Sequence, residues 1–97
     1  MISVKVQGKG SEQVLAACDE ELLGKTFSEG SLKLEVSKSF YGGDKMEIET
    51  FAELLEKATN SNLVGEKTVT KAVELGLVLK DSIVKIQNIP HVQILKL

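Results

Sequence analysis

Ile2-Ser-Val-Lys-Val-Gln-Gly-Lys-Gly-Ser-Glu-Gln-Val-Leu-Ala-Ala-Cys18 is the stretch that decides the fold. Apolar residues alternate with polar ones over residues 2–7, which is the period of a strand with one buried face. Residues 14–18 are apolar on both faces and predict a second strand. Because the glycine-rich segment 8–11 between them is typical of a turn, we expect an antiparallel hairpin.

The acidic segment after this hairpin predicts a single helical turn. Asp19 is a good helix cap, Glu20 and Glu21 suit the positive end of a helix dipole, and Gly24 can end the turn. A hard-metal site beside Cys18 is the alternative. Consecutive residues on a helix point about 100° apart and do not converge on one ion, so we favour the helix start.

The middle of the chain predicts a strand, a turn-rich tip and two helices. Residues 32–36 alternate like a strand, and residues 39–44 are rich in turn formers. Thr50-x-x-Glu53 predicts a capping box, and Asn60-Ser-Asn62 predicts an interruption between the helices. The expected apolar helix stripes consist of Phe51, Leu54, Leu55 and Ala58 in the first helix and Val69, Ala72 and Val73 in the second, which we expect to end near Gly76.

The end of the chain completes the predicted sheet. We expect strands over residues 83–86 and 92–97, joined by a turn at Asn88-Ile-Pro90. The fold class is therefore predicted as α+β: an antiparallel sheet of four or five strands with two main helices packed on one face. At 97 residues we expect one domain, residues 1–97.

The amino-acid composition indicates the cellular compartment and limits the classes of binding partner. The only cysteine, Cys18, excludes an internal disulfide and favours a reducing compartment, and no apolar run reaches the roughly 18 residues of a membrane span. We therefore expect a cytoplasmic protein that does not enter a membrane. All 12 basic residues are lysine, and the net charge is −2. Because arginine is the usual residue for bidentate recognition of bases, this composition disfavours sequence-specific nucleic-acid binding but permits a local lysine patch.

The segment around Phe40-Tyr41 is the most suggestive functional feature. Two aromatic residues on a glycine-containing tip, flanked by Lys38 and Lys45, are suited to stacking on unpaired bases while the lysines contact phosphates. The alternative is that one ring caps the core and the other covers a hairpin. We favour this alternative, because the chain has only four aromatic residues to fill its core.

Three further lysines are candidates for RNA contact. Lys5, Lys33 and Lys85 lie on outward positions of predicted strands, and they could share one open sheet face. No aromatic residue alternates among them, so the stacking platform of an RNA-recognition motif is missing. A solvated face that carries lysines is the simpler interpretation.

The sequence offers no set of residues typical of a catalytic, metal or cofactor site. Leu23-Gly-Lys-Thr26 lacks the preceding glycine of a phosphate-binding loop, where Asp19 stands instead. His91 is the only histidine; it could pair with Cys18 as a base, but a partly buried residue at a strand end is the favoured interpretation. We expect a protein that is not an enzyme and binds no small-molecule cofactor.

Five segments in order resemble a known archaeal family. They are Cys18-Asp-Glu-Glu-Leu-Leu-Gly-Lys-Thr-Phe27, the Ser39-Phe-Tyr41 segment, Asn62-Leu-Val-Gly-Glu-Lys67, Ala72-Val-Glu-Leu-Gly-Leu-Val78 and Ile89-Pro-His-Val-Gln-Ile94. The chain resembles, over nearly its full length, the family numbered four hundred and twenty-four among the domains of unknown function. The resemblance implies an archaeal source and an association with RNA and translation, and it supplies no catalytic residues.

Two functional hypotheses follow. The first is an accessory RNA-binding protein of archaeal translation or RNA processing, with RNA or ribosome-associated factors as partners. The second is a protein–protein interaction module, for example a homodimer formed through an exposed strand edge. Loss of binding with added salt distinguishes them, because counterion release accompanies RNA binding but not the burial of an apolar interface.

Overall fold

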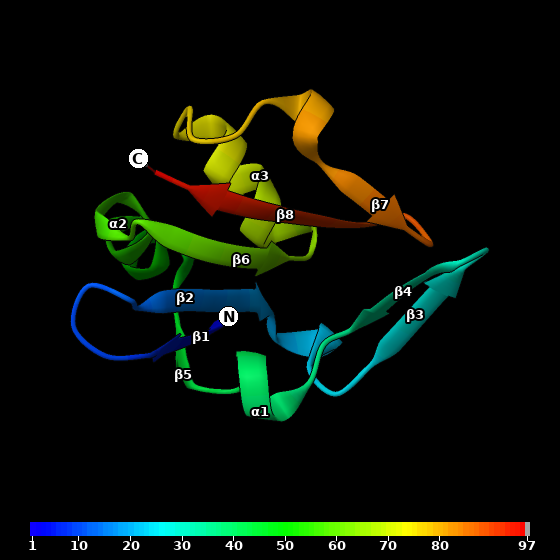
Figure 1. The fold of residues 1–97 in the computed structure, drawn as a ribbon, viewed down its shortest axis with the longest axis horizontal. Coiled ribbons are helices and arrows are strands. Elements are labelled where there is room, and N and C mark those ends of the chain that lie inside the picture. Colours follow the sequence, from blue (N-terminus) through cyan, green and yellow to red (C-terminus); the bar gives the residue numbers. More distant parts are fainter. Residues whose placement is uncertain (97) are drawn as a thin grey trace.

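A six-stranded mixed sheet organises the protein, whose computed structural model describes residues 1–96 (Figure 1). In spatial order its strands are β5 (Asp44–Met46), β1 (Ile2–Gln7), β2 (Val14–Asp19), β6 (Asn60–Val64), β8 (Ile89–Leu95) and β7 (Val84–Ile86). The predicted hairpin is confirmed: β1 and β2 pair antiparallel, with Ile2 opposite Asp19 and Gln7 opposite Val14. The α+β class is confirmed as well.

The sheet differs from the prediction at its centre. Asn60-Ser-Asn62, predicted to interrupt two helices, instead begins β6, which pairs parallel with β2 and antiparallel with β8. The purely antiparallel sheet of four or five strands is therefore wrong. The two asparagines hid the strand because they lie on the face of β6 opposite to Leu63, where the sheet is not covered by the large helices.

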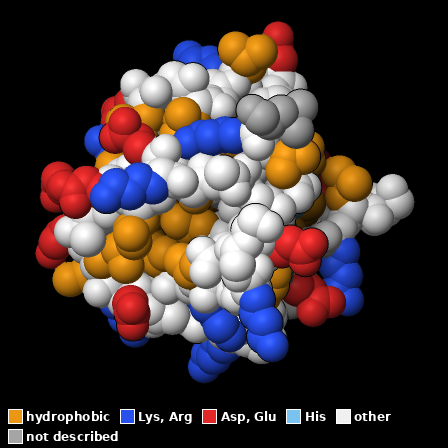
Figure 2. All heavy atoms as spheres, turned by 60° about the vertical axis from the view of Figure 1, so that its left-hand side comes forward, with side chains coloured by type: hydrophobic (Ala, Val, Ile, Leu, Met, Phe, Trp, Pro, Cys, Tyr) orange, Lys and Arg blue, Asp and Glu red, His pale blue; other side chains and the backbone are white. Residues whose placement is uncertain are grey.

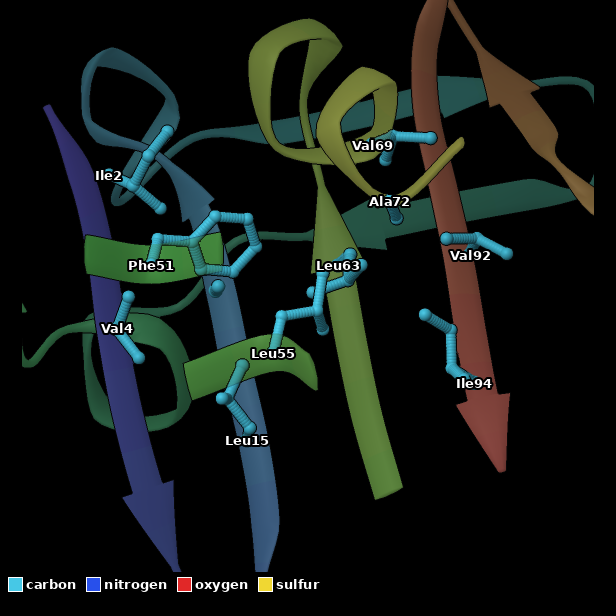
Figure 3. Close-up of a cluster of buried hydrophobic side chains, with 11 residues drawn as sticks. Ile2, Val4, Leu15, Phe51, Leu55, Leu63, Val69, Ala72, Val92 and Ile94 are labelled. Atoms are coloured by element: carbon cyan, nitrogen blue, oxygen red, sulfur yellow. The ribbon is translucent and has the colours of Figure 1, made fainter. Parts of the chain in front are cut away.

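Two helices cover the other face of the sheet. They are α2 (Ile48–Lys57) and α3 (Glu66–Glu74), and α3 ends before Gly76 as predicted. Figure 3 shows the core between helices and sheet, which is centred on Phe51, Leu55 and Leu63, each fully buried. The predicted capping box is wrong, because α2 begins at Ile48 and Thr50 lies inside its first turn. Leu54, predicted to lie in the core, is 37% exposed.

The start of α3 is capped from a distant strand. Asp19 precedes the short 3₁₀ helix η1 (Glu20–Leu22) as predicted, but its side chain does not cap that turn. Its carboxylate instead accepts hydrogen bonds from the backbone N–H groups of Lys67 and Thr68, in the first turn of α3. A side chain at Gly65 would collide with Asp19, since an ideal Cβ there lies 2.4 Å from the carboxyl carbon. Asp19 therefore fastens α3 to the end of β2.

Smaller elements pack on the face of the sheet opposite to α2 and α3, which we call the second face. The helix α1 (Lys38–Tyr41) contacts β1 and β2, and a separate hairpin of β3 (Thr26–Glu29) and β4 (Leu32–Glu35) contacts β7. The strand predicted over residues 32–36 exists, but it pairs only within this hairpin. A second cluster of buried residues lies under these elements and includes Cys18, Val36 and Tyr41.

The C-terminal part closes the edge of the sheet. After the 3₁₀ helix η2 (Lys80–Ser82), β7 turns into β8 through Gln87 and Asn88, which both have positive φ, 51° and 64°. The turn thus lies before Ile89, and Pro90, predicted in the turn, belongs to β8. The final strand was predicted to reach Leu97, which lies outside the described residues. Among residues 1–96 no helix is both long and apolar enough to cross a membrane.

Candidate functional site

The only tyrosine and the only histidine of the chain converge on one asparagine. The hydroxyl of Tyr41, from α1, donates to Oδ1 of Asn62 on β6 at 3.1 Å. The ring nitrogen Nε2 of His91, from β8, lies 2.8 Å from the same oxygen. Since an amide oxygen only accepts, Nε2 carries the proton and donates. Three elements far apart in the sequence are thereby joined on the second face of the sheet.

Burial keeps this cluster uncharged near neutral pH. Burial lowers the pKa of His91 below its ordinary value of 6.5, so the ring is neutral and its Nδ1 is an acceptor. Burial, with a smaller contribution from Cys18, raises the pKa of Tyr41 to about 12. The cluster therefore presents neutral hydrogen-bonding groups rather than an acid–base pair.

Side chains of β1 hold α1 in place by donating hydrogen bonds to the backbone carbonyl groups of α1. Ser3 Oγ donates to the Tyr41 carbonyl at 2.8 Å, Gln7 Nε2 donates to the Phe40 carbonyl at 2.8 Å, and Lys5 Nζ donates to the Ser39 carbonyl. These donors are alternate residues of β1 and share one face of the strand. They satisfy carbonyls that a helix of four residues leaves without partners. A polar row on β1 thus fixes the position of the Tyr41 ring.

Part of the second face remains open to solvent over β6 and β8 (Figure 1). Gln93 lies directly opposite Asn62 and is exposed, whereas Asn62 and His91 are half-buried. Because α1 packs on β1 and β2 and the β3–β4 hairpin packs on β7, the strands between them are left uncovered here. We name the surface formed by Asn62, His91 and Gln93 the polar sheet face.

The aromatic tip predicted from the sequence is not a tip. Residues 38–41 form α1, with Ser37 as its cap, and the Tyr41 ring is only 4% exposed. Phe40 is half-buried against the same core, and the two rings meet edge to face, with their centroids 4.9 Å apart. The favoured interpretation, in which the rings pack, agrees with this geometry. A base cannot stack on Tyr41 without displacing α1.

The two lysines predicted beside these rings differ in their surroundings. Lys38 is exposed at the start of α1. Its side chain lies beside Gly24, because a Cβ added to that glycine would be 3.3 Å from the Lys38 Cε, and exposed Lys25 follows Gly24 in the sequence. Lys45 on β5 pairs with Glu20 at 2.9 Å, and this hydrogen bond lowers the pKa of Glu20. Figure 2 shows lysine side chains gathered along its lower edge, the side on which α1 lies. Lys38 is therefore the lysine of α1 that is free for an outside ligand, and exposed Lys25 follows Gly24, beside which the Lys38 side chain lies.

The other three predicted lysines do not share a sheet face. Lys5 binds the carbonyl of Ser39 on the second face. Lys33 lies on β4, in the separate hairpin, and pairs with Glu35 at 3.1 Å. Lys85 lies opposite Pro90 and faces the α3 side of the sheet. The idea of one lysine-bearing face is wrong, because the sequence period fixes the face within a strand but not which sheet or side the strand joins.

Cys18 and His91 do not form a nucleophile–base pair. They lie in the same cross-strand row, but Val64 of β6 stands between them, which corresponds to about 10 Å for two strand spacings. The Cys18 thiol is fully buried, and burial, helped by the charges of Asp19 and Glu21, raises its pKa to about 12. No cluster of three or more His, Cys, Asp or Glu side chains suited to a metal ion occurs among the described residues.

An apolar groove lies at the C-terminal end of α2. Figure 2 looks onto the side that carries α2 and the β1–β2 turn, and it shows hydrophobic side chains gathered in a hollow. The groove has a volume of about 420 Å³. Val6 and Leu54 on its rim are 51% and 37% exposed, and Lys57 lies beside them. The hydrophobic core between the helices and the sheet is therefore continuous with this groove, which explains the exposure of Leu54.

Sequence reasoning missed the residues of the polar sheet face. The segment Asn60-Ser-Asn62 predicts a break between helices, and no sequence motif singles out Gln93. The available signal lay in Ile89–Leu95, where Pro90, Val92 and Ile94 alternate with His91 and Gln93, whereas Asn60–Val64 has no apolar alternation in its sequence.

Comparison with known proteins agrees with the resemblance seen in the sequence. The family model for "Protein of unknown function (DUF424)" matches residues 7–97. An uncharacterized conserved protein from Methanopyrus kandleri, an archaeon, is similar in structure, with 32% sequence identity and a TM-score of 0.82. The match covers 99% of this chain and 93% of that one. Comparison with curated proteins gives no match. The predicted membership is confirmed: this chain belongs to the DUF424 family, an uncharacterised domain family.

Proposed function

We propose that this protein is a non-enzymatic RNA-binding protein that serves translation or RNA processing in the archaeal cytoplasm. The single observation that carries the proposal is the polar sheet face of Asn62, His91 and Gln93, which lies uncovered beside the lysine-bearing helix α1. The archaeal assignment rests on the similar protein from Methanopyrus kandleri. Single-stranded RNA is the favoured form, because exposed base edges bind to open sheets in several RNA-binding modules.

The polar sheet face carries the hydrogen-bonding groups that base edges require. The Asn62 oxygen accepts from Tyr41 and lies within hydrogen-bond distance of His91, which leaves the amide N–H groups of half-buried Asn62 for another acceptor. His91 offers Nδ1 as an acceptor, and the exposed Gln93 amide offers both a donor and an acceptor. Uncharged groups of both kinds distinguish base edges without repelling the phosphate backbone.

The lysines near α1 supply the contacts to the backbone. Lys25 and Lys38 are both exposed, and the Lys38 side chain lies beside Gly24, the residue that precedes Lys25. As point charges they neutralise phosphates without selecting a sequence. In this revised form of the hypothesis, Lys38 keeps its predicted role, Lys45 is held by Glu20, and the rings of Phe40 and Tyr41 support the surface instead of stacking on bases.

Fluorescence anisotropy with a labelled unstructured 12-nucleotide RNA tests the proposal over a range of salt concentrations. The double variant Lys25→Gln/Lys38→Gln should reduce the slope of log affinity against log salt by about 1.4, since each phosphate contact on a single strand contributes about 0.7. The double variant Lys9→Gln/Lys57→Gln removes the same charge from two other exposed sites and should leave the slope nearly unchanged.

Substitution of Gln93 tests the sheet separately from the charges. Gln93→Ala should weaken RNA binding by up to about tenfold while keeping the salt slope, because a neutral hydrogen bond of about 0.5–1.5 kcal/mol is lost. Its exposed position means that the melting temperature should remain unchanged. Equal affinity in all of these variants and in the unchanged protein would contradict the proposed contact surface.

A protein–protein interaction module is the second candidate, and the apolar groove beside Leu54 favours it. A pull-down from archaeal lysate with and without ribonuclease separates the two functions. Partners lost after ribonuclease treatment support RNA binding. Partners that remain after treatment, and that are lost in the variant Leu54→Asp, support the interaction module instead. Sedimentation of the free protein tests self-association.

A further inference from the structure

A second cleft lies between α3 and the edge of the sheet, on the face opposite to the polar sheet face. It is formed where α3, η2 and β7 meet and has a volume of about 550 Å³, within the range of small-molecule sites, about 300–1,000 Å³. Its apolar lining consists of Val69, Val73, Ile83 and Pro90. Val69 and Pro90 are buried, whereas Val73 and Ile83 remain partly open to the cleft. We name this site the α3 cleft.

Two lysines stand on the rim of the α3 cleft. Lys80 belongs to η2 and Lys85 to β7, and both are exposed. Within residues 1–96 neither ammonium lies within 4.0 Å of a carboxylate, although four other ion pairs occur there. Lys85 points to this side because it lies directly opposite Pro90 in the β7–β8 pair. The rim therefore carries two cations without an internal counterion.

One acidic residue completes the charge of the α3 cleft. Glu66 lines it from the first turn of α3, so the lining carries two positive charges and one negative charge. The backbone N–H groups of Lys67 and Thr68 at the start of α3 are not available to a ligand, because Asp19 accepts from both. A net charge of +1 matches a monoanion better than a phosphate dianion. Thr70, exposed on the same side of α3, adds a hydroxyl.

We propose that the α3 cleft binds a small amphipathic carboxylate, with the apolar body against Val73 and Ile83 and the carboxylate between Lys80 and Lys85. The apolar lining accounts for affinity to the body of the ligand, since burial of apolar surface stabilises by about 25 cal/mol per Å². The paired lysines account for the preference for a carboxylate over a neutral head group. This site does not depend on the proposed RNA contact, which lies on the other face of the sheet.

Titration of the ¹⁵N-labelled protein with decanoate below its micelle concentration tests the site. We expect saturable changes in the amide signals of Val73, Ile83 and Lys85. Acetate has the charge without the apolar body, and decyltrimethylammonium has the same tail with the opposite charge. Neither should give these changes at the same concentration.

Charge variants give the decisive comparison. Lys80→Gln and Lys85→Gln should each weaken decanoate binding by up to about fivefold, the equivalent of an exposed ion pair of about 0.2–1 kcal/mol. The control Lys9→Gln/Lys57→Gln should not change it. If the signal changes gather instead at Val6 and Leu54 and disappear with Lys57→Gln, decanoate occupies the apolar groove and the proposal for the α3 cleft is wrong. Equal binding of decanoate and decyltrimethylammonium would also overturn it.

Discussion

The carboxylate of Asp19 binds Thr68 twice, accepting from its backbone N–H at 2.9 Å and from its hydroxyl at 2.7 Å. Asp19 ends β2, and Thr68 lies in the first turn of α3; both side chains are buried. A residue beside the acidic turn it was expected to cap thus serves a helix 49 residues further along the chain. The contact joins the first hairpin to the helix that covers the sheet.

Asp19→Ala should lower the free energy of unfolding by about 2–4 kcal/mol. The substitution removes a helix cap, typically worth about 0.5–2 kcal/mol, and leaves the buried N–H and hydroxyl of Thr68 without partners. Urea denaturation monitored by circular dichroism measures the change. Glu21→Ala, two residues further along and exposed, should change stability by less than about 0.5 kcal/mol. Similar losses in both variants would refute the capping role.

Gly65 and Asp19 should be energetically coupled. Gly65 has φ of 111°, and an added Cβ would lie 2.4 Å from the Asp19 carboxyl carbon, so Gly65→Ala should destabilise through both strain and collision. In the Asp19→Ala background the collision with the carboxyl group disappears, while the close approach to the Cβ of residue 19, at 2.9 Å, and the backbone strain stay. The second substitution should therefore cost at least about 1 kcal/mol less there, as a double-mutant cycle would measure. Additive effects would mean that the two side-chain positions do not compete.

Local patterns predicted the elements of the fold better than their arrangement. The β1–β2 hairpin and α3 were found because their hydrophobic periods are complete within a few residues. The parallel pairing of β2 with β6 was missed, because Asn60 and Asn62 carry no apolar signal on the open face of the sheet. The capping function of Asp19 was assigned to the wrong helix, since a side chain at the end of a strand reaches elements that are distant in sequence.

The two neighbouring leucines of α2 should respond very differently to truncation. Leu55 is fully buried against the sheet, whereas Leu54 is 37% exposed at the apolar groove. Leu55→Ala should cost about 2–5 kcal/mol, the usual range for a buried leucine, and Leu54→Ala should cost less than about 1 kcal/mol. Thermal and urea unfolding of both variants measure the difference. Equally large losses in both variants would support the apolar stripe expected from the sequence, which includes both leucines.

Cys18 should resist alkylation in the folded protein. The thiolate is the reactive form, and a pKa of about 12 in place of 9.0 lowers its fraction at pH 8 by about 1,000-fold. The side chain is also fully buried. Iodoacetamide labelling followed by mass spectrometry should therefore be slow in buffer. It should be fast in about 8 M urea, because unfolding exposes the thiol. Rapid labelling of the native protein would show that Cys18 is accessible.

The candidate site was less predictable than the fold. Lys38 was identified from the sequence and is exposed, but the exposure of Tyr41 depended on a tip that folds into α1. The sequence pattern places the three polar residues of β1 that hold α1 on the solvent side of a strand. In the structure they bind the carbonyl groups of α1. A binary pattern separates buried from exposed positions, and it does not show which polar residues face another segment of the same chain.

Acidification should destabilise the protein through His91. Burial lowers the pKa of His91 in the folded state below 6.5, so the unfolded chain binds the proton first as pH falls. The contribution to stability is therefore complete above about pH 6.5 and is lost below it, at no more than about 1.4 kcal/mol per pH unit for one group. Protonation does not disrupt the bond from Nε2 to Asn62, but it places a charge in a half-buried position. Unfolding free energies at pH 7.5, 6.5 and 5.5 should fall more steeply in the unchanged protein than in His91→Gln, which keeps a donor for Asn62 and does not titrate. The carboxylates are common to both proteins, so the difference between the two curves isolates His91, and parallel curves would show that its pKa is the same in both states.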